Sequence, residues 1–195
     1  MTKAERTRQF IIEKAAPIFN KKGIAGTAIS DIMEATKLAK GGVYGNFENK
    51  DEICLEAFNY LTKTLAAEIN HGMDSQVSAK DKLFALLDFY RDRLQKNNTG
   101  GCPILNFGTE ADDTNPVIKQ RVKETIQSSQ NRIANTVKRG IEAGEFKTTF
   151  DAETFAIKMF AMIEGAILIS RVQNSNDHMV LITNILKAEI SQNTV

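Results

Sequence analysis

Hydrophobic residues recur with the period of an α-helix along nearly the whole chain. The clearest example precedes Gly23, where apolar residues follow an i, i+3, i+4, i+7 pattern behind a capping box formed by Thr2 and Glu5. Segments in which apolar and polar residues alternate are rare, and the sequence has only three prolines. Because this pattern does not indicate a β-sheet, the chain is predicted to be all-α.

Start and stop signals divide the pattern into about nine helices. Pro17 lies inside the first helix and removes one backbone hydrogen bond, so we expect a kink there. The predicted helices lie before Gly23, after Thr27, over about 39–46, after Asn49, over about 79–96, around 104–107, over about 116–143, after Asp151 and over about 177–191.

Residues 27–47 have the pattern of a helix-turn-helix, in which two short amphipathic helices flank a tight turn. The second helix has few apolar residues, and its exposed side is predicted to be small and polar. Such a surface lets the backbone approach the wall of a DNA groove. We therefore predict a three-helix DNA-binding domain over 1–48 and a helical domain over 49–195. The residues on the exposed side are Lys40, Gly41, Gly42, Tyr44 and Asn46.

Charge is distributed unevenly, although the net charge of the whole chain is only +1. Residues 1–50 have nine basic and five acidic side chains, and the remaining residues have 16 basic and 19 acidic ones. A basic N-terminal part favours a polyanion as its partner. A chance fluctuation in a small domain would give the same numbers, so charge alone does not show whether the N-terminal part binds a polyanion.

A spaced motif in the N-terminal part resembles that of a known family. It consists of Phe19-x-x-x-Gly23, Thr27-x-Ile29-x-x-Ile32 and Lys40-Gly41-x-x-Tyr44-x-x-Phe47-x-x-Lys50-x-x-Ile53. This motif resembles the tetracycline-repressor-like (TetR) family of bacterial transcription regulators. Three positions depart from the family pattern: Lys37 replaces a glycine in the turn, Ala39 replaces a serine or threonine cap, and Asn46 replaces a histidine.

The resemblance implies a role for each matching residue in DNA binding. Thr27 and Ala28, at the start of the second helix, would bind a phosphate, and Lys50 would bind another through its charge and the helix dipole. Lys40, Gly41 and Gly42 would face the major groove, and Tyr44 and Asn46 would contact the DNA backbone. The alternatives are structural: Thr27 as a helix cap only, Tyr44 as packing, and Lys37 and Lys40 as solvated lysines.

The C-terminal helices are predicted to enclose a ligand pocket, although aromatic and methionine side chains at helical spacing are also typical of ordinary core. Glu164 lies in an apolar run and would bind a polar ligand group or pair with an arginine across a dimer. Cys102 would be a reactive thiol or a small buried hydrophobe, and Cys54 is expected to be inert. The candidate pocket residues are Phe58, Leu61, Phe84, Tyr90, Cys102, Phe107, Ile126, Phe160, Met162 and Glu164.

The last two predicted helices are apolar over wide faces, a pattern that suits either a four-helix dimer interface or intramolecular core. The resemblance to the family favours the interface. The candidate interface residues are Phe155, Met159, Ile163, Ile167, Leu181 and Ile185.

The patterns predict a DNA-binding protein with a helical C-terminal domain. The resemblance to the family implies more: a ligand-responsive repressor that binds double-stranded DNA at a palindromic operator as a homodimer and is released by a small-molecule inducer. The alternative is a helical protein-binding adaptor with a DNA-incompetent head. With two histidines and no Glu-x-x-His pair, we expect neither an enzyme nor a metal or cofactor site. The two cysteines form no disulfide framework and no apolar run reaches the length of a membrane span, so a cytoplasmic protein is expected.

Overall fold

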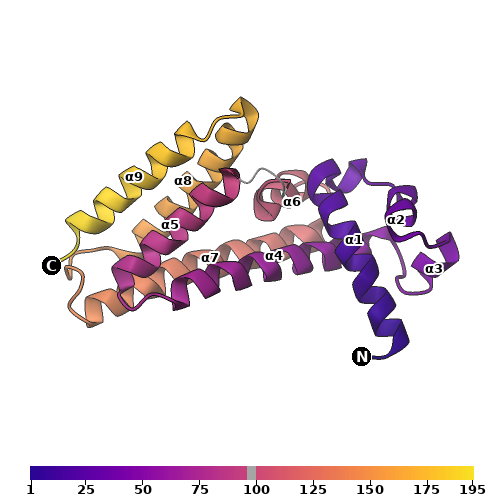
Figure 1. Cartoon of the computed structure of the whole chain (residues 1–195), viewed down its shortest axis with the longest axis horizontal. Coiled ribbons are helices and arrows are strands. Elements are labelled where there is room, and N and C mark those ends of the chain that lie inside the picture. Colours follow the sequence, from indigo (N-terminus) through magenta and orange to yellow (C-terminus); the bar gives the residue numbers. More distant parts are fainter. Residues whose placement is uncertain (96–99) are drawn as a thin grey trace. The chain divides into compact units, whose positions relative to one another are not determined.

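The computed structural model describes residues 1–95 and 100–195, and within these the protein is helical, as predicted (Figure 1). The predicted end of one helix at residue 96 lies outside the described residues. In the described part of the chain there are nine helices: α1 (Lys3–Gly26), α2 (Ile29–Thr36), α3 (Lys40–Tyr44), α4 (Lys50–Asp74), α5 (Ala79–Gln95), α6 (Pro103–Ala111), α7 (Pro116–Glu142), α8 (Ala152–Gln173) and α9 (Asp177–Gln192).

The contacts within the chain divide it into two compact units. Unit 1 comprises Met1–Leu65 and Thr99–Lys123, and unit 2 comprises Ala66–Asn98 and Glu124–Val195. Helices α4 and α7 each begin in unit 1 and continue into unit 2. The predicted domain boundary at residue 48 therefore does not coincide with an end of either unit, and it remains a prediction of where the DNA-binding part ends.

Unit 1 is built around the inner face of α1, which packs against α2, and α2 packs in turn against α3. The capping box between Thr2 and Glu5 forms as predicted, with Glu5 N donating to Thr2 Oγ1 over 3.2 Å. Helix α1 is interrupted at Gly23 (φ 80°, ψ 175°), where the sequence predicts its end, and Pro17 lies inside the helix with helical φ and ψ angles. Helices α1, α2 and α3 together form the head of the protein. The buried apolar side chains of this head are Ile11, Ile12, Ala15, Ala16, Phe19, Ile32, Val43 and Phe47.

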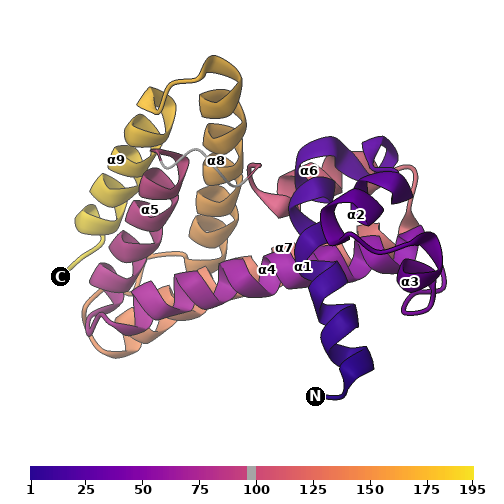
Figure 2. The same cartoon turned by 45° about the vertical axis from the view of Figure 1, so that its right-hand side comes forward.

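Helix α6 also belongs to unit 1 and packs beside the C-terminal end of α1 (Figures 1 and 2). Its Phe107 ring lies 5.1 Å from that of Phe58 on α4, measured between ring centroids, and both side chains are buried. Asn115 begins α7 by accepting from Ile118 N over 3.0 Å, with Pro116 at the first helical position, as the sequence predicts.

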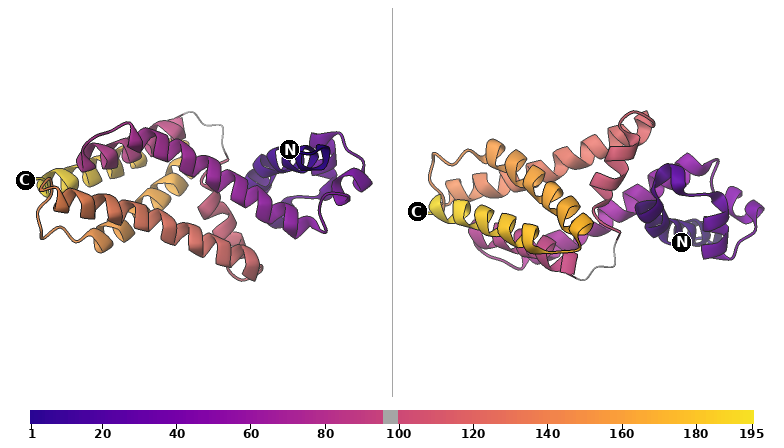
Figure 3. Two further views of the ribbon diagram at one scale, coloured as in Figure 1. Left: turned by 90° about the horizontal axis from the view of Figure 1, so that it is seen from below. Right: turned by 90° about the horizontal axis from the view of Figure 1, so that it is seen from above.

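In unit 2, α8 and α9 form a hairpin that packs against α5 (Figures 2 and 3). Asp151 caps α8 by accepting from Thr154 N over 3.1 Å, and its interactions with Thr154 lower the pKa of the Asp151 carboxyl. Gly140 on α7 permits close packing, because a Cβ there would overlap the Phe146 ring. None of the helices in the described residues has both the length and the apolar character needed to cross a membrane.

Candidate nucleic-acid interface

The short helix α3 forms at the predicted place despite two unfavourable residues. Lys37, which ends α2, has a left-handed backbone (φ 59°, ψ 23°), a conformation that is strained for residues other than glycine. Ala39 is the N-cap of α3 and has no side chain that accepts a hydrogen bond. The inner side of the helix is anchored by the buried side chains of Val43, in α3, and Phe47, just after it. Packing therefore compensates for poor local propensity.

The outward side of α3 has little bulk. A Cβ on Gly41 would have no atom within 4 Å, so no packing within the described chain requires glycine there. A Cβ on Gly45, by contrast, would lie 2.9 Å from Gly41 O. Tyr44 is 37% exposed, and Lys40 Nζ lies 5.9 Å from the centroid of its ring. This arrangement leaves an ammonium group, a phenol and an uncovered backbone facing outward.

Asn46 and Arg8 fix the C-terminal end of α3. The amide of Asn46 donates to Gly42 O over 2.8 Å, so the side chain predicted to meet DNA is partly committed to its own helix. Arg8 on α1 donates to Asn46 O over 2.6 Å, and its guanidinium lies 4.2 Å from the centroid of the Phe47 ring. Arg8 also forms an ion pair with Glu52 at 2.8 Å. Arg8 was not among the predicted DNA-binding residues, although it lies three residues before the buried Ile11 and so on the same face of α1.

The start of α2 differs from the prediction. Ala28, not Thr27, is the N-cap. Thr27 is only 1% exposed, and its hydroxyl donates to Gly23 O over 2.6 Å. The Ala28 amide donates to Asp31 over 2.9 Å, and Lys22 at 2.8 Å together with this amide lowers the pKa of Asp31. The Thr27 hydroxyl thus already donates to a carbonyl group within the chain, and its predicted contact with a phosphate stays a prediction.

Lys50 also has a different environment from the one expected. Its ammonium donates to Ile24 O and to Thr27 O, each over 2.7 Å. Lys50 therefore binds the last carbonyl groups of the α1 segment and joins α1 to α4. The cap of α4 is as predicted, since Asn49 Oδ1 accepts from Glu52 N over 2.8 Å. In this structure Lys50 is first of all a structural residue of the head.

Replacing Lys50 with methionine tests this structural role. Lys50→Met keeps the aliphatic stem but removes both hydrogen bonds, so we expect the free energy of unfolding in urea to fall by about 1–2 kcal/mol. Lys63→Met, at an exposed position on the same helix, is the matched control and should change stability little. If Lys50→Met unfolds like the wild type and only weakens DNA binding, Lys50 acts as a phosphate contact instead.

The candidate ligand residues are distributed over both units. In unit 1, Phe58 and Phe107 are in contact and Cys102 is the buried N-cap of α6; Leu61 is half-buried. In unit 2, the half-buried Phe84 ring has Lys187 Nζ at 5.0 Å and Lys80 Nζ at 5.7 Å from its centroid. The remaining candidates in unit 2 are buried Tyr90 and Glu164 and half-buried Ile126, Phe160 and Met162.

The cysteines show no metal-binding arrangement. Cys54 is fully buried, and burial raises the pKa of its thiol to about 12, which agrees with the expected inert role. In the described part of the chain, no group of three or more His, Cys, Asp or Glu side chains is placed to hold a metal ion.

The structure separates the apolar residues of α8 and α9 into two sets. Four candidate interface residues, Phe155, Met159, Ile163 and Ile167, are buried within the protomer, and only Leu181 and Ile185 are exposed, by 57% and 45%. Other apolar side chains on the two helices are exposed instead. They are Ile157, Leu168, Ile169, Val172 and Val180.

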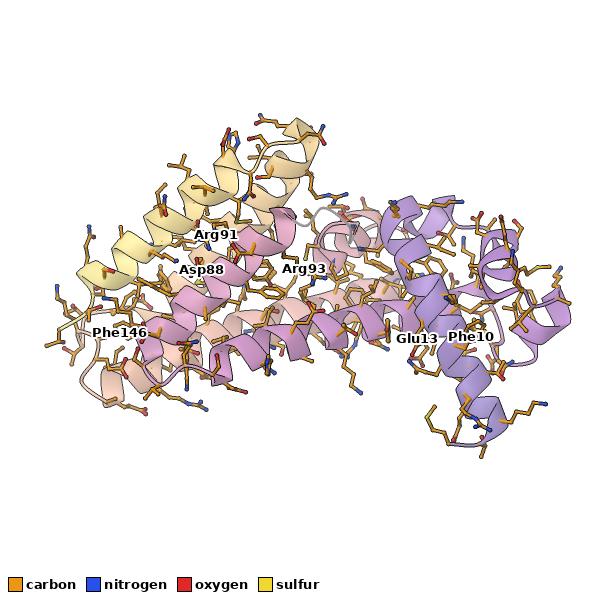
Figure 4. All side chains as sticks on the ribbon, viewed as in Figure 1. Phe10, Glu13, Asp88, Arg91, Arg93 and Phe146 are labelled. Atoms are coloured by element: carbon orange, nitrogen blue, oxygen red, sulfur yellow. The ribbon has the colours of Figure 1, made fainter. Side chains whose placement is uncertain are left out.

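A polar cluster lies on the neighbouring helix α5 (Figure 4). Asp88 accepts from Arg91 on α5 and from Lys187 on α9, each over 2.6 Å. Asn176, in the turn before α9, donates to Arg91 O over 3.3 Å. These contacts join α5 to α9 and its preceding turn, and so they hold the outer helices of unit 2 together.

Comparisons with known proteins identify both parts of the chain. Residues 11–57 match the family described as "Bacterial regulatory proteins, tetR family", and residues 79–186 match the "Tetracyclin repressor-like, C-terminal domain". The structure is similar to that of a TetR-family regulator from Cytophaga hutchinsonii, with a TM-score of 0.93 and 36% identity, covering 100% of this chain and 98% of that one. A TetR regulator from Chloroflexus aurantiacus has the same identity and coverage and a TM-score of 0.94.

Among curated proteins, the transcriptional regulator TtgR of Pseudomonas putida is 28% identical over 170 residues, which cover 84% of this chain and 80% of TtgR. The matches thus extend over the helix-turn-helix and the C-terminal helices alike. The chain belongs to the TetR family of bacterial transcription regulators, which act by binding DNA and are not enzymes.

Proposed function

We propose that this regulator is a repressor that binds a palindromic operator as a homodimer and leaves it when a small molecule binds the C-terminal helices. The observation that carries the proposal is the outward side of α3. No side chain packs over Gly41 there, and the side chains of Lys40 and Tyr44 lie on either side of it. A helix with small residues on its outer side can approach base edges closely in the major groove.

The alternative, an adaptor with a DNA-incompetent head, rested on Lys37 and Ala39. Both residues are accommodated: Lys37 adopts the left-handed turn and α3 forms after Ala39. Arg8 and the buried Val43 stabilise the same helix from the inner side. Since the residues that favoured an incompetent head do not disrupt its geometry, the DNA-binding function is better supported.

The homodimer is supported by the exposed stripe of α8. Ile157, Ala161, Gly165, Leu168 and Val172 recur at spacings of three and four residues, and a Cβ on Gly165 would have no atom within 4 Å. A second helix could approach closely at the small residues and bury the larger ones on either side. Leu181 and Ile185 are two exposed apolar side chains, four residues apart, on the neighbouring helix α9. Two such hairpins would form a four-helix interface.

In this proposal, the two heads of the dimer are about one helical turn of DNA apart, roughly 34–36 Å, and contact the two half-sites of the operator. The inducer would favour a conformation in which the heads no longer match that spacing. Because DNA and inducer favour different states, each must weaken the binding of the other by the same factor. The protein would act in the cytoplasm, where its DNA target lies.

Fluorescence anisotropy with the intergenic DNA upstream of the protein's own gene tests this function. Lys40→Ala should weaken binding by about 1–3 kcal/mol and change sequence preference, because it removes a base contact, whereas Tyr44→Phe should weaken binding to all sequences. The matched controls are Lys63→Ala and Tyr60→Phe on α4. An absence of any salt-dependent affinity of the wild-type protein for DNA would favour the adaptor instead.

A further inference from the structure

The C-terminal end of α1 is held from two sides. After Gly23 the helix is interrupted, so the amides and carbonyls of residues 23–27 need partners outside the regular helix. The carboxylate of Glu110 on α6 accepts from Ile24 N over 2.5 Å and from Ala25 N over 2.6 Å. Both oxygens of one side chain thus bind consecutive amides of another helix, a charge-assisted pair that is stronger than neutral hydrogen bonds.

Gly23 is needed for this contact for two reasons. Its positive φ of 80° is strained for an L-residue with a side chain. In addition, a Cβ at this position would lie 2.6 Å from Glu110 Oε2. A side chain on residue 23 would therefore displace the carboxylate as well as strain the backbone.

Asn106 makes a second contact one turn earlier on α6. Its amide nitrogen lies 2.9 Å from Asn20 O and 2.8 Å from Gly100 O. Residues 106 and 110 are four apart, so both side chains lie on the same face of α6. Helix α6 is thus joined to the end of α1 at two points, which we call the α1–α6 link: Glu110 and Asn106 with residues 20–25.

Lys50 of α4 binds the same short segment from its carbonyl side, at Ile24 O and Thr27 O. Ile24 therefore donates its amide to an anion on α6 and offers its carbonyl to a cation on α4. Two residues after Thr27, helix α2 of the helix-turn-helix begins. A displacement of α6 relative to α4 must either break these charge-assisted bonds or move the segment that leads into α2.

We propose that Glu110 couples α6 to the helix-turn-helix: the α1–α6 link makes the position of α6 and the binding of DNA depend on each other. Glu110 is a positioning residue, because it acts through the backbone of α1. This inference rests on the proposed DNA-binding function. It assigns to this carboxylate, together with Asn106, the connection between α1 and a helix that leads directly into α7.

Coupling can be measured without knowing the inducer, because it is reciprocal. We expect the upstream intergenic DNA to slow amide hydrogen exchange in residues 103–111 of the wild-type protein, about fivefold or more. In Glu110→Gln, the amide group presents an NH₂ towards one of the two backbone N–H groups, so one hydrogen bond is lost. The slowing of exchange in α6 should then largely disappear, while DNA still protects α3.

Two further variants complete the experiment. Asn106→Ala removes the second contact without touching the carboxylate and should reduce the protection of α6 in the same direction. Glu142→Gln, at an exposed position on α7, makes the same chemical change elsewhere and should leave the protection at its wild-type value. Thermal unfolding confirms that each variant is folded.

The outcomes separate this inference from the function on which it rests. If Glu110→Gln and Asn106→Ala transmit protection to α6 as the wild type does, the coupling role is wrong while DNA binding stands. If DNA fails to protect α3 in the wild-type protein, the proposed function itself is wrong.

Discussion

Gly41→Leu is expected to leave the head folded and to reduce DNA affinity by at least about tenfold, or 1.4 kcal/mol. The ideal Cβ of Gly41 meets no atom of a packing neighbour within 4 Å, so the added side chain starts in open space in the free protein. Leucine is also favoured over glycine inside a helix by roughly 0.5–1 kcal/mol. The thermal midpoint should therefore stay the same or rise, while the new side chain keeps α3 away from the groove.

Opposite changes in stability and DNA affinity distinguish this result from simple damage to the fold. Gly72 provides the matched control, because it lies on α4 and its Cβ would also be free of contacts. Gly72→Leu should stabilise the protein to a similar extent with no change in anisotropy titrations. Wild-type affinity in Gly41→Leu would show that the outward side of α3 does not enter the groove.

Local signals in the sequence were sufficient to predict the helices and the turn of the head. The Thr2–Glu5 capping box, the interruption at Gly23 and the Asn49 cap each depend on residues within four positions of one another. Such short-range chemistry can be read from a sequence without knowing the fold. The unfavourable residues Lys37 and Ala39 could be recognised for the same reason. The structure has Lys37 in the left-handed turn after α2 and Ala39 at the N-cap of α3, as the motif predicts.

The roles of Lys50 and Glu110 could not be predicted, because their partners are distant in the sequence. Lys50 binds a carbonyl 26 residues away, and Glu110 binds an amide 86 residues away. A lysine at a helix start and a glutamate on an amphipathic helix have the same sequence signature whether they face solvent or another helix. Only packing decides between these environments, so the contacts of Lys50 with the end of α1 had no local signal in the sequence, and its contact with a phosphate stays a prediction.

The apolar residues of α8 illustrate a different limit. Helix α8 has apolar side chains on both faces, so periodicity alone does not separate residues that pack in the protomer from those that face outward. Met159 and Ile163 are buried, whereas Ile157 and Leu168 on the same helix are exposed. Two adjacent interfaces, one within the chain and one proposed between chains, require a helix that is hydrophobic nearly all round.

The double substitution Leu181→Asp with Ile185→Asp is expected to produce a folded monomer that has lost most of its operator affinity. Both side chains are largely exposed in the protomer, so charges there cost its core little. In the proposed dimer they would be buried, and unpaired carboxylates in an apolar interface are strongly unfavourable. Without the second head, the gain of roughly 10²–10⁴-fold from simultaneous binding to two half-sites is lost.

Sedimentation velocity gives the oligomeric state, and anisotropy on a palindrome and on one half-site gives the two affinities. For the double variant, the affinity for the palindrome should fall almost to the affinity for one half-site. The half-site affinity should be unchanged, because neither substitution lies in the head. Val77→Asp is the matched control: Val77 is 96% exposed and lies outside α8 and α9, so the same chemical change should leave the dimer intact. A double variant that sediments as a dimer would place the interface on another surface of the protomer.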